Sequence, residues 1–252
     1  MSVTAARRER AKGNTMEPVN NNLLLALQPE DAARLLAACT MVELGSGQML
    51  FDPGDLINQC YFPCDAAIAS FQVVTADGEA IETALIGREG ALGGIVSHGR
   101  LPAFARAVVV QAGAFAKVPL ALLEQLKHER PAVDRLFTRY ADCFIAQTFQ
   151  SVACNALHSV EQRAARWLCG TSDRTPGTVI RITHEQLAAL LGVGRGYISR
   201  GLQSFRQRGL IELQRGGIRI TDEEGLRHLS CDCDALVRQH FERVLKGVYP
   251  DD

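Results

Sequence analysis

The sequence of 252 residues predicts an α+β protein in which a strand-rich domain, a long helix and a small helical domain follow one another. Three observations carry this prediction. Residues 41–117 contain short apolar runs that Gly and Pro interrupt about every 8 to 12 residues, as in a β-barrel or sandwich. Residues 131–157 hold an uninterrupted helical pattern. Residues 183–220 hold two short helices and then a hairpin.

Residues 1–21 are predicted to be a disordered tail, because the ordered pattern begins only after Met16, which could be the natural start. The tail is basic, but no apolar segment with a cleavage site follows it, so it is not a signal peptide. No apolar run has the length of a membrane span, and we expect a cytoplasmic protein with no membrane contact. An amphipathic helix is predicted over residues 23–38, where Pro29 marks a kink or a new start.

The long helix of residues 131–157 carries a stripe of mostly aromatic side chains. They recur every three or four residues, as in a coiled-coil seam. Stripes at this spacing are usually only core, whereas the family resemblance described below implies a seam between two copies of the chain. Its residues are Phe137, Tyr140, Phe144 and Thr148.

The stretch 183–220 is the most informative part of the chain. Thr183 and Gln186 have the spacing of a capping box, so a helix is expected to begin there. Gly192 can end that helix, and a second one is expected from Arg195 to about residue 208. Its apolar stripe faces the first helix, while its other face is polar. A hairpin over residues 211–220 completes the pattern of a winged helix-turn-helix.

The charge distribution favours nucleic-acid binding by this stretch. Residues 158–220 contain ten Arg, no Lys and four acidic residues, whereas the whole chain has a net charge of −1. An Arg-rich segment in an otherwise acidic protein is the pattern expected for phosphate contacts. The predicted DNA contacts are Arg195, Tyr197, Ser199, Arg200, Gln203, Arg206 and Arg215, with Arg163 as a further phosphate contact.

The eight cysteines have no regular spacing, and reduced thiols are expected. Neither Cys60-x3-Cys64 nor Cys231-x-Cys233 has the spacing of a zinc knuckle, so no metal or cofactor is predicted. The alternative is an enzyme with a thiol or metal site made by Cys231, Cys233 and His228. The sequence shows no nucleophile motif and no P-loop, and we predict that the protein is not an enzyme.

Residues 158–221 resemble the C-terminal DNA-binding domain of the Crp/Fnr family of bacterial transcription regulators. The resemblance rests on residues 163–168, 183–192 and 195–211. Arg195 and Arg200 match two arginines of the family's recognition helix. Gly196 stands where that helix often has Glu, so the target sequence should differ from the family's best-known one.

Residues 41–117 resemble the cyclic-nucleotide-binding β-roll of the same family, a jelly-roll-like double-stranded β-helix. The resemblance implies an effector pocket near Glu89, Gly90, Arg106 and Ala107. Glu89 precedes its Gly instead of following one, and Ala107 lacks the hydroxyl usual after the Arg. We therefore do not expect cAMP to bind, and the effector is unknown or absent.

The resemblance also implies the assembly and the partners. It predicts a homodimer that binds pseudo-palindromic double-stranded DNA and works with RNA polymerase. A ligand-binding module that no longer binds DNA is a further alternative, against which the polar face of residues 195–207 argues. One final helix with no role beyond packing is expected after a cap at residues 221–224. The predicted units are 1–21 (tail), 22–130 (β-roll), 131–157 (dimerisation helix), 158–225 (DNA-binding domain) and 226–252 (helical extension).

Overall fold

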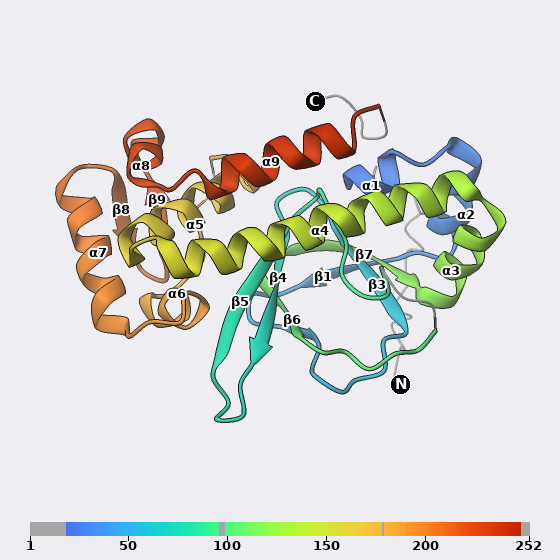
Figure 1. Cartoon of the computed structure of the whole chain (residues 1–252), viewed down its shortest axis with the longest axis horizontal. Coiled ribbons are helices and arrows are strands. Elements are labelled where there is room, and N and C mark those ends of the chain that lie inside the picture. The colour runs from blue at the N-terminus through green and yellow to red at the C-terminus, as the bar shows by residue number, and fades with distance from the viewer. Residues whose placement is uncertain (1–18, 96–98, 178, 248–252) are drawn as a thin grey trace, which may run out of the picture.

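The computed structural model describes residues 19–95, 99–177 and 179–247. A β-rich domain and a small helical domain lie along one long helix, α4 (Pro131–Leu157), which crosses the whole molecule (Figure 1). The predicted α+β architecture is therefore confirmed.

The β-rich domain consists of two antiparallel sheets packed face to face. One sheet has the order β1-β7-β3 and the other β2-β6-β4-β5. Phe51, Leu92 and Phe115 are buried between them. Residues 75–79 form the tight turn that joins the fourth and fifth strands, and Gly78 has the positive φ that this turn requires. The strands are β1 (Thr40–Leu44), β2 (Met49–Phe51), β3 (Gln59–Pro63), β4 (Ile68–Val74), β5 (Ala80–Ile86), β6 (Arg106–Gln111) and β7 (Gly113–Pro119).

The first helices are tied to the β-rich domain through Asn21. Its side-chain oxygen caps α1 (Asn22–Leu25), and its Nδ2 donates to the carbonyls of Pro63 and Gly90 at 2.8 and 2.9 Å. Residues 19–21 thus belong to the folded part and not to a tail, and residues 1–18 of the predicted tail lie outside the described residues. Pro29 marks a new start, since it is the first residue of α2 (Pro29–Ala37).

Helix α4 follows α3 (Leu120–Glu129) and has the predicted bounds. The stripe predicted to form a seam between two copies does not lie on its outer face. Phe137 and Tyr140 are buried within the chain, at 0% and 1% exposure. Phe137 packs edge-on against Phe62, and Tyr140 packs edge-on against Phe241 of the C-terminal helix. The structure does not support a seam between two copies at these positions.

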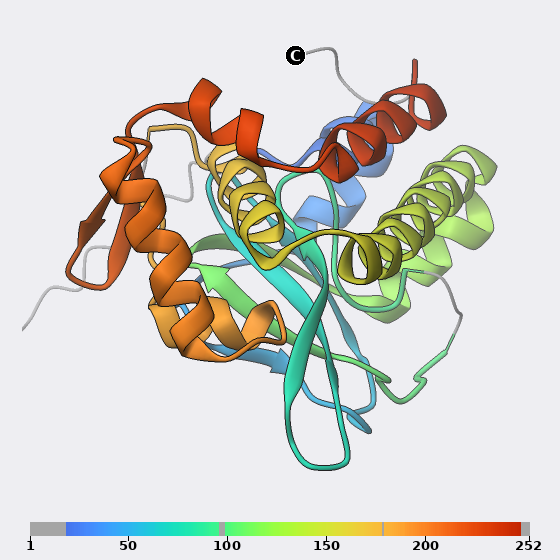
Figure 2. The ribbon, with the colours of Figure 1, turned by 60° about the vertical axis from the view of Figure 1, so that its left-hand side comes forward.

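The helical domain is built on α5 (Val160–Arg174), which a capping box of Ser159 and Gln162 begins. After the hairpin, the chain forms two helices where one was predicted. Asp222 caps the first of these helices. Residues 230–232 are not helical and separate it from the second helix, which lies beside α4 (Figure 2). The remaining elements are α6 (His184–Leu190), α7 (Arg195–Gln207), β8 (Ile211–Gln214), β9 (Gly217–Ile220), α8 (Glu223–Leu229) and α9 (Cys233–Val244).

Candidate nucleic-acid interface

The turn between α6 and α7 follows the local signals of the sequence. Thr183 Oγ1 accepts from the backbone of Gln186 at 3.1 Å, and Gln186 Oε1 accepts from the backbone of Thr183 at 2.9 Å. Gly192 has φ 61°, a conformation that few other residues adopt. Ile198, Leu202 and Phe205 are buried, so α7 is fixed against the rest of the domain by one face only.

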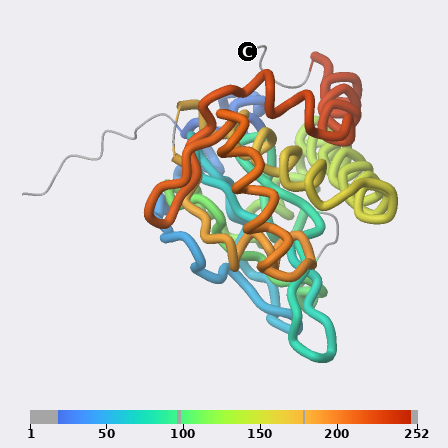
Figure 3. Tube along the Cα trace, turned by 90° about the vertical axis from the view of Figure 1, so that its left-hand side faces the viewer, coloured from blue at the N-terminus to red at the C-terminus, as the bar shows by residue number. Residues whose placement is uncertain are grey.

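The other face of α7 is exposed to solvent. Helix α7 itself lies on the side of the molecule that faces the viewer in Figure 3. The guanidinium of Arg200 lies over the ring of Tyr197, 4.7 Å from its centroid. Such a contact holds the arginine without using its hydrogen-bond donors. Arg195 lies 3.6 Å from Glu185, and both side chains are about 70% exposed, so this pair is weak. The exposed residues on this face include Arg195, Tyr197, Arg200, Gln203 and Arg206.

Three further predicted residues have different surroundings. Ser199 is half-buried, and its hydroxyl is hydrogen-bonded to His184 Nδ1 at 3.0 Å. Arg215 is exposed at the turn of the β8–β9 hairpin, next to Gly216 with its φ of 72°. Arg163 is buried and donates to the carbonyl of Leu191, so it stabilises the helix-turn-helix and cannot contact phosphate as predicted.

The structure does not bring together the four residues predicted for an effector pocket. Glu89 accepts from Arg174 at 2.8 Å. Arg106 forms a bidentate pair with Asp52 at 2.7 and 3.0 Å, which lowers the pKa of that carboxyl. Glu89 and Arg106 line different hollows, Ala107 is fully buried, and Gly90 packs against Tyr140. These four residues therefore do not line one common effector pocket.

A different cavity of about 470 Å³ lies between the β-rich domain and α4. Its described lining residues include no charged side chain and are mostly apolar. Phe144 of α4 lines it and packs on Phe71, with ring centroids 5.2 Å apart. Thr148, one turn later, also lines it. Two residues predicted for the dimer seam therefore face this cavity. The sequence gives no signal for it, because the lining comes from strands, loops and a helix that are far apart in the chain.

Comparisons with known proteins agree with the helix-turn-helix. Residues 162–229 match the model of the Crp-like helix-turn-helix domain. The match assigns this part of the chain to the helix-turn-helix domain of the Crp/Fnr family. That family is one of transcription regulators and not of enzymes, in agreement with the prediction.

Individual Crp/Fnr relatives are distant in sequence. The transcriptional regulatory protein btr of Bordetella pertussis is 25% identical over 130 residues, which span 49% of this chain and 54% of btr, about half its length. FixK2 from Bradyrhizobium japonicum has a TM-score of 0.65 at 13% identity, over 77% of this chain and 98% of that one. The c-di-GMP-responsive global regulator CLP from Xanthomonas campestris has a TM-score of 0.60 at 18% identity, over 77% and 99%. The two structures establish the fold.

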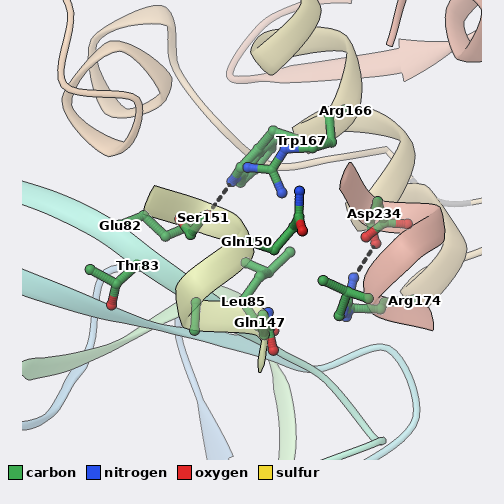
Figure 4. A pocket seen from close by; sticks show the side chains of 13 residues that line it. Glu82, Thr83, Leu85, Gln147, Gln150, Ser151, Arg166, Trp167, Arg174 and Asp234 are labelled. Atoms are coloured by element: carbon green, nitrogen blue, oxygen red, sulfur yellow. Dashed lines mark hydrogen bonds between the residues drawn. The ribbon is translucent and has the colours of Figure 1, made fainter. Parts of the chain in front are cut away.

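The two domains of the chain are docked through a polar contact around a small cavity of about 30 Å³ (Figure 4). Trp167 Nε1 of α5 donates to Glu82 Oε1 of β5 at 3.0 Å. The second carboxyl oxygen of Glu82 is buried without a hydrogen-bond partner among the described residues. Burial raises the pKa of Glu82 to about 7, although the bond from Trp167 and the charges of Arg166 and Arg174 lower it.

Helix α4 does have an uncovered apolar stripe, on a face that the sequence-based prediction did not select. Ile145, Phe149 and Val152 are 42%, 71% and 66% exposed. They are spaced i, i+4 and i+7, so they lie on one side of the helix. No helix among the described residues is long and apolar enough to cross a membrane.

Cys231 and Cys233, which the enzyme hypothesis groups with His228, have different neighbours in the structure. Cys231 and Cys233 lie beside Cys154 and His158 at the end of α4, while His228 is exposed and is not part of the group. Burial raises the pKa of the Cys154 thiol to about 12 and also raises that of Cys231. A catalytic thiol needs a lowered pKa, so Cys154 and Cys231 are not activated nucleophiles.

Proposed function

We propose that this protein is a sequence-specific DNA-binding transcription regulator that acts as a homodimer in the cytoplasm. One observation carries the proposal: the exposed face of α7 holds arginines and amides, on a helix fixed by a Crp-like helix-turn-helix. Arg195, Arg200 and Gln203 would read base edges in the major groove. Arg206 and Arg215 would contact phosphates and set the position of the protein on the duplex.

The stripe of Ile145, Phe149 and Val152 supports the homodimer. Such large apolar side chains at one uncovered helix face are typical of an interface. Two copies that pair their α4 helices about a two-fold axis would bury the stripe. The two α7 helices would then reach successive major grooves, roughly 34 Å apart, on a pseudo-palindromic site. RNA polymerase is the expected further partner at promoters.

The cavity of about 470 Å³ supports an uncharged, largely apolar effector. A nucleotide phosphate buried there would need a cationic partner, which the described lining does not offer. This argues against cAMP, and equally against the c-di-GMP named for the relative CLP. Since Phe144 and Thr148 line the cavity from α4, an occupant would act directly on the helix that carries the dimer stripe.

The DNA proposal is tested by fluorescence anisotropy of the full chain on a pool of labelled duplexes. Replacing Arg195 and Arg200 with Ala should weaken binding at least tenfold, because each lost base contact costs about 1–3 kcal/mol. Arg34→Ala is the control, since Arg34 lies on α2 and pairs with Glu129, and it should bind as the wild type does. Equal binding by all three proteins would refute the assignment of α7.

The effector proposal is tested with Nile red, an uncharged apolar dye. One molecule should bind per chain, and Ala105→Trp should reduce that binding by filling the cavity. Calorimetry with cAMP should show no binding. Low-micromolar cAMP binding, or dye binding that Ala105→Trp leaves unchanged, would contradict the assignment.

A further inference from the structure

Four side chains from two distant segments converge at the junction of the long helix and the helical domain. Cys154 and His158 are spaced i, i+4 at the end of α4, where His158 is the C-cap. Cys231 lies between α8 and α9, and Cys233 is the first residue of α9. One ligand atom from each of the four lies within 4.8 Å of all the others. The three cysteines are buried, and the histidine is half-buried.

The distances fit the corners of a tetrahedron around one ion. Cys154 Sγ lies 3.5 Å from Cys231 Sγ, and Cys233 Sγ lies 3.5 Å from His158 Nδ1. Bonds of about 2.3 Å to sulfur and about 2.0 Å to nitrogen, at tetrahedral angles, place two sulfurs about 3.8 Å apart and a sulfur and a nitrogen about 3.5 Å apart. Three cysteines and one histidine are also a common donor set of structural zinc sites.

The surroundings of the four residues suit a negatively charged centre. Gln150 Nε2 donates to Cys233 Sγ at 3.1 Å, as outer groups do to metal-bound thiolates. The positive charge of Arg166 lies close to Cys154. The Nε atoms of Arg163 and Arg166 are buried and lack a hydrogen-bond partner among the described residues. An ion bound by three thiolates and one neutral imidazole has a net charge of −1, which these cations balance.

We propose that Cys154, His158, Cys231 and Cys233 bind one Zn²⁺ ion. Binding releases the three thiol protons to solvent and leaves the oxidation state of sulfur unchanged. The ion would join the end of α4 to the α8–α9 segment, and so hold the helical domain at a set angle to the long helix. The sequence analysis predicted no metal, since Cys231-x-Cys233 lacks zinc spacing and the partners lie 77 and 75 residues away.

The test uses the full chain, purified under reducing conditions and freed of metal by a chelator. Titrated with Co²⁺, it should bind one ion per chain and develop the intense visible bands of a tetrahedral thiolate site. One equivalent of Zn²⁺ should abolish those bands. The same equivalent should lower the number of thiols that react with Ellman's reagent by three.

Cys233→Ser and His158→Gln should lose the tetrahedral spectrum or bind Co²⁺ at least tenfold more weakly. His228→Gln and Cys169→Ser are the matched controls, an exposed histidine nearby and a buried cysteine elsewhere, and should titrate as the wild type does. The wild-type thiol count holds even if a variant fails to fold. An absence of tetrahedral bands in the reduced wild type, an iron–sulfur chromophore, or a native Cys154–Cys231 disulfide would each overturn the proposal. None of these outcomes depends on DNA binding.

Discussion

Helices α4 and α7 each leave one face uncovered, and the two faces have opposite chemistry. On α7 the exposed side chains are arginines, glutamines and a tyrosine, which remain hydrated when no partner is present. On α4 they are Ile145, Phe149 and Val152, whose exposure to water is unfavourable. A polar face is stable in water without its partner, whereas an apolar stripe of this size favours a permanent protein–protein contact. For the proposed homodimer, this difference predicts that two copies of the chain associate first and that DNA then binds to the assembled pair.

The largest effect is expected from a charge placed in the apolar stripe. Phe149→Glu should convert a dimer into a monomer, because an unpaired carboxylate would have to be buried in the interface. Loss of the second half-site should weaken DNA binding by about a hundredfold or more. Sedimentation and anisotropy measure the two effects. Leu25→Glu, at a 51% exposed leucine on α1, is the control and should remain dimeric. A wild type that is already monomeric at micromolar concentration would contradict the assignment of the apolar stripe as a dimer interface.

Removal of Arg200 tests whether the polar face reads sequence. Arg200→Ala should cost about 1–3 kcal/mol of base discrimination in each half-site, if its two donors bind the O6 and N7 of a guanine. The preference should relax at one symmetric position of the target. Competition between duplexes that differ at single positions measures this effect. Unchanged preference at every position would show that the reading face lies elsewhere.

The pH dependence of stability tests the contact between Glu82 and Trp167, which joins the β-rich domain to the helical domain. Burial raises the pKa of Glu82 to about 7, above its usual 4.5, so the folded state keeps the carboxyl protonated after the unfolded state has ionised. Its contribution to stability is complete below the unfolded pKa and is lost as the pH rises through about 7, by at most about 1.4 kcal/mol per pH unit. Denaturation of Glu82→Gln from pH 4 to 8 should lack this decline. A wild type and variant with parallel profiles would refute the assignment.

The smallest effect is expected from the wing. Arg215→Ala should weaken all DNA sequences alike and reduce the salt dependence of binding by about one unit of slope. Anisotropy at several salt concentrations measures the slope. A change of preference at one base position would instead show that Arg215 reads sequence.

The helix-turn-helix could be predicted almost residue by residue, because its signals are local. The capping box of Thr183, the positive φ of Gly192 and the start of α7 at Arg195 depend on a few neighbouring residues. Arg163 is the exception, since its burial under the carbonyl of Leu191 follows from the packing of α5 on the turn.

The outward face of α4 and the cavity could not be predicted from spacing. The helix carries two stripes of suitable period, and only the packing of Tyr140 against the backbone of Ala91 and against Phe241 decides which one is inside. The same applies to Arg106, whose partner Asp52 is 54 residues away. Contacts between distant segments leave no periodic pattern in the sequence.

The most direct measurement of the central claim is a selection from random duplexes by the full-length wild type. We predict enrichment of a pseudo-palindrome with half-site centres roughly 34 Å apart, which corresponds to one helical turn between the two α7 helices of a dimer. Recovery of no enriched motif, or of a single half-site without symmetry, would contradict a dimer that reads DNA through α7.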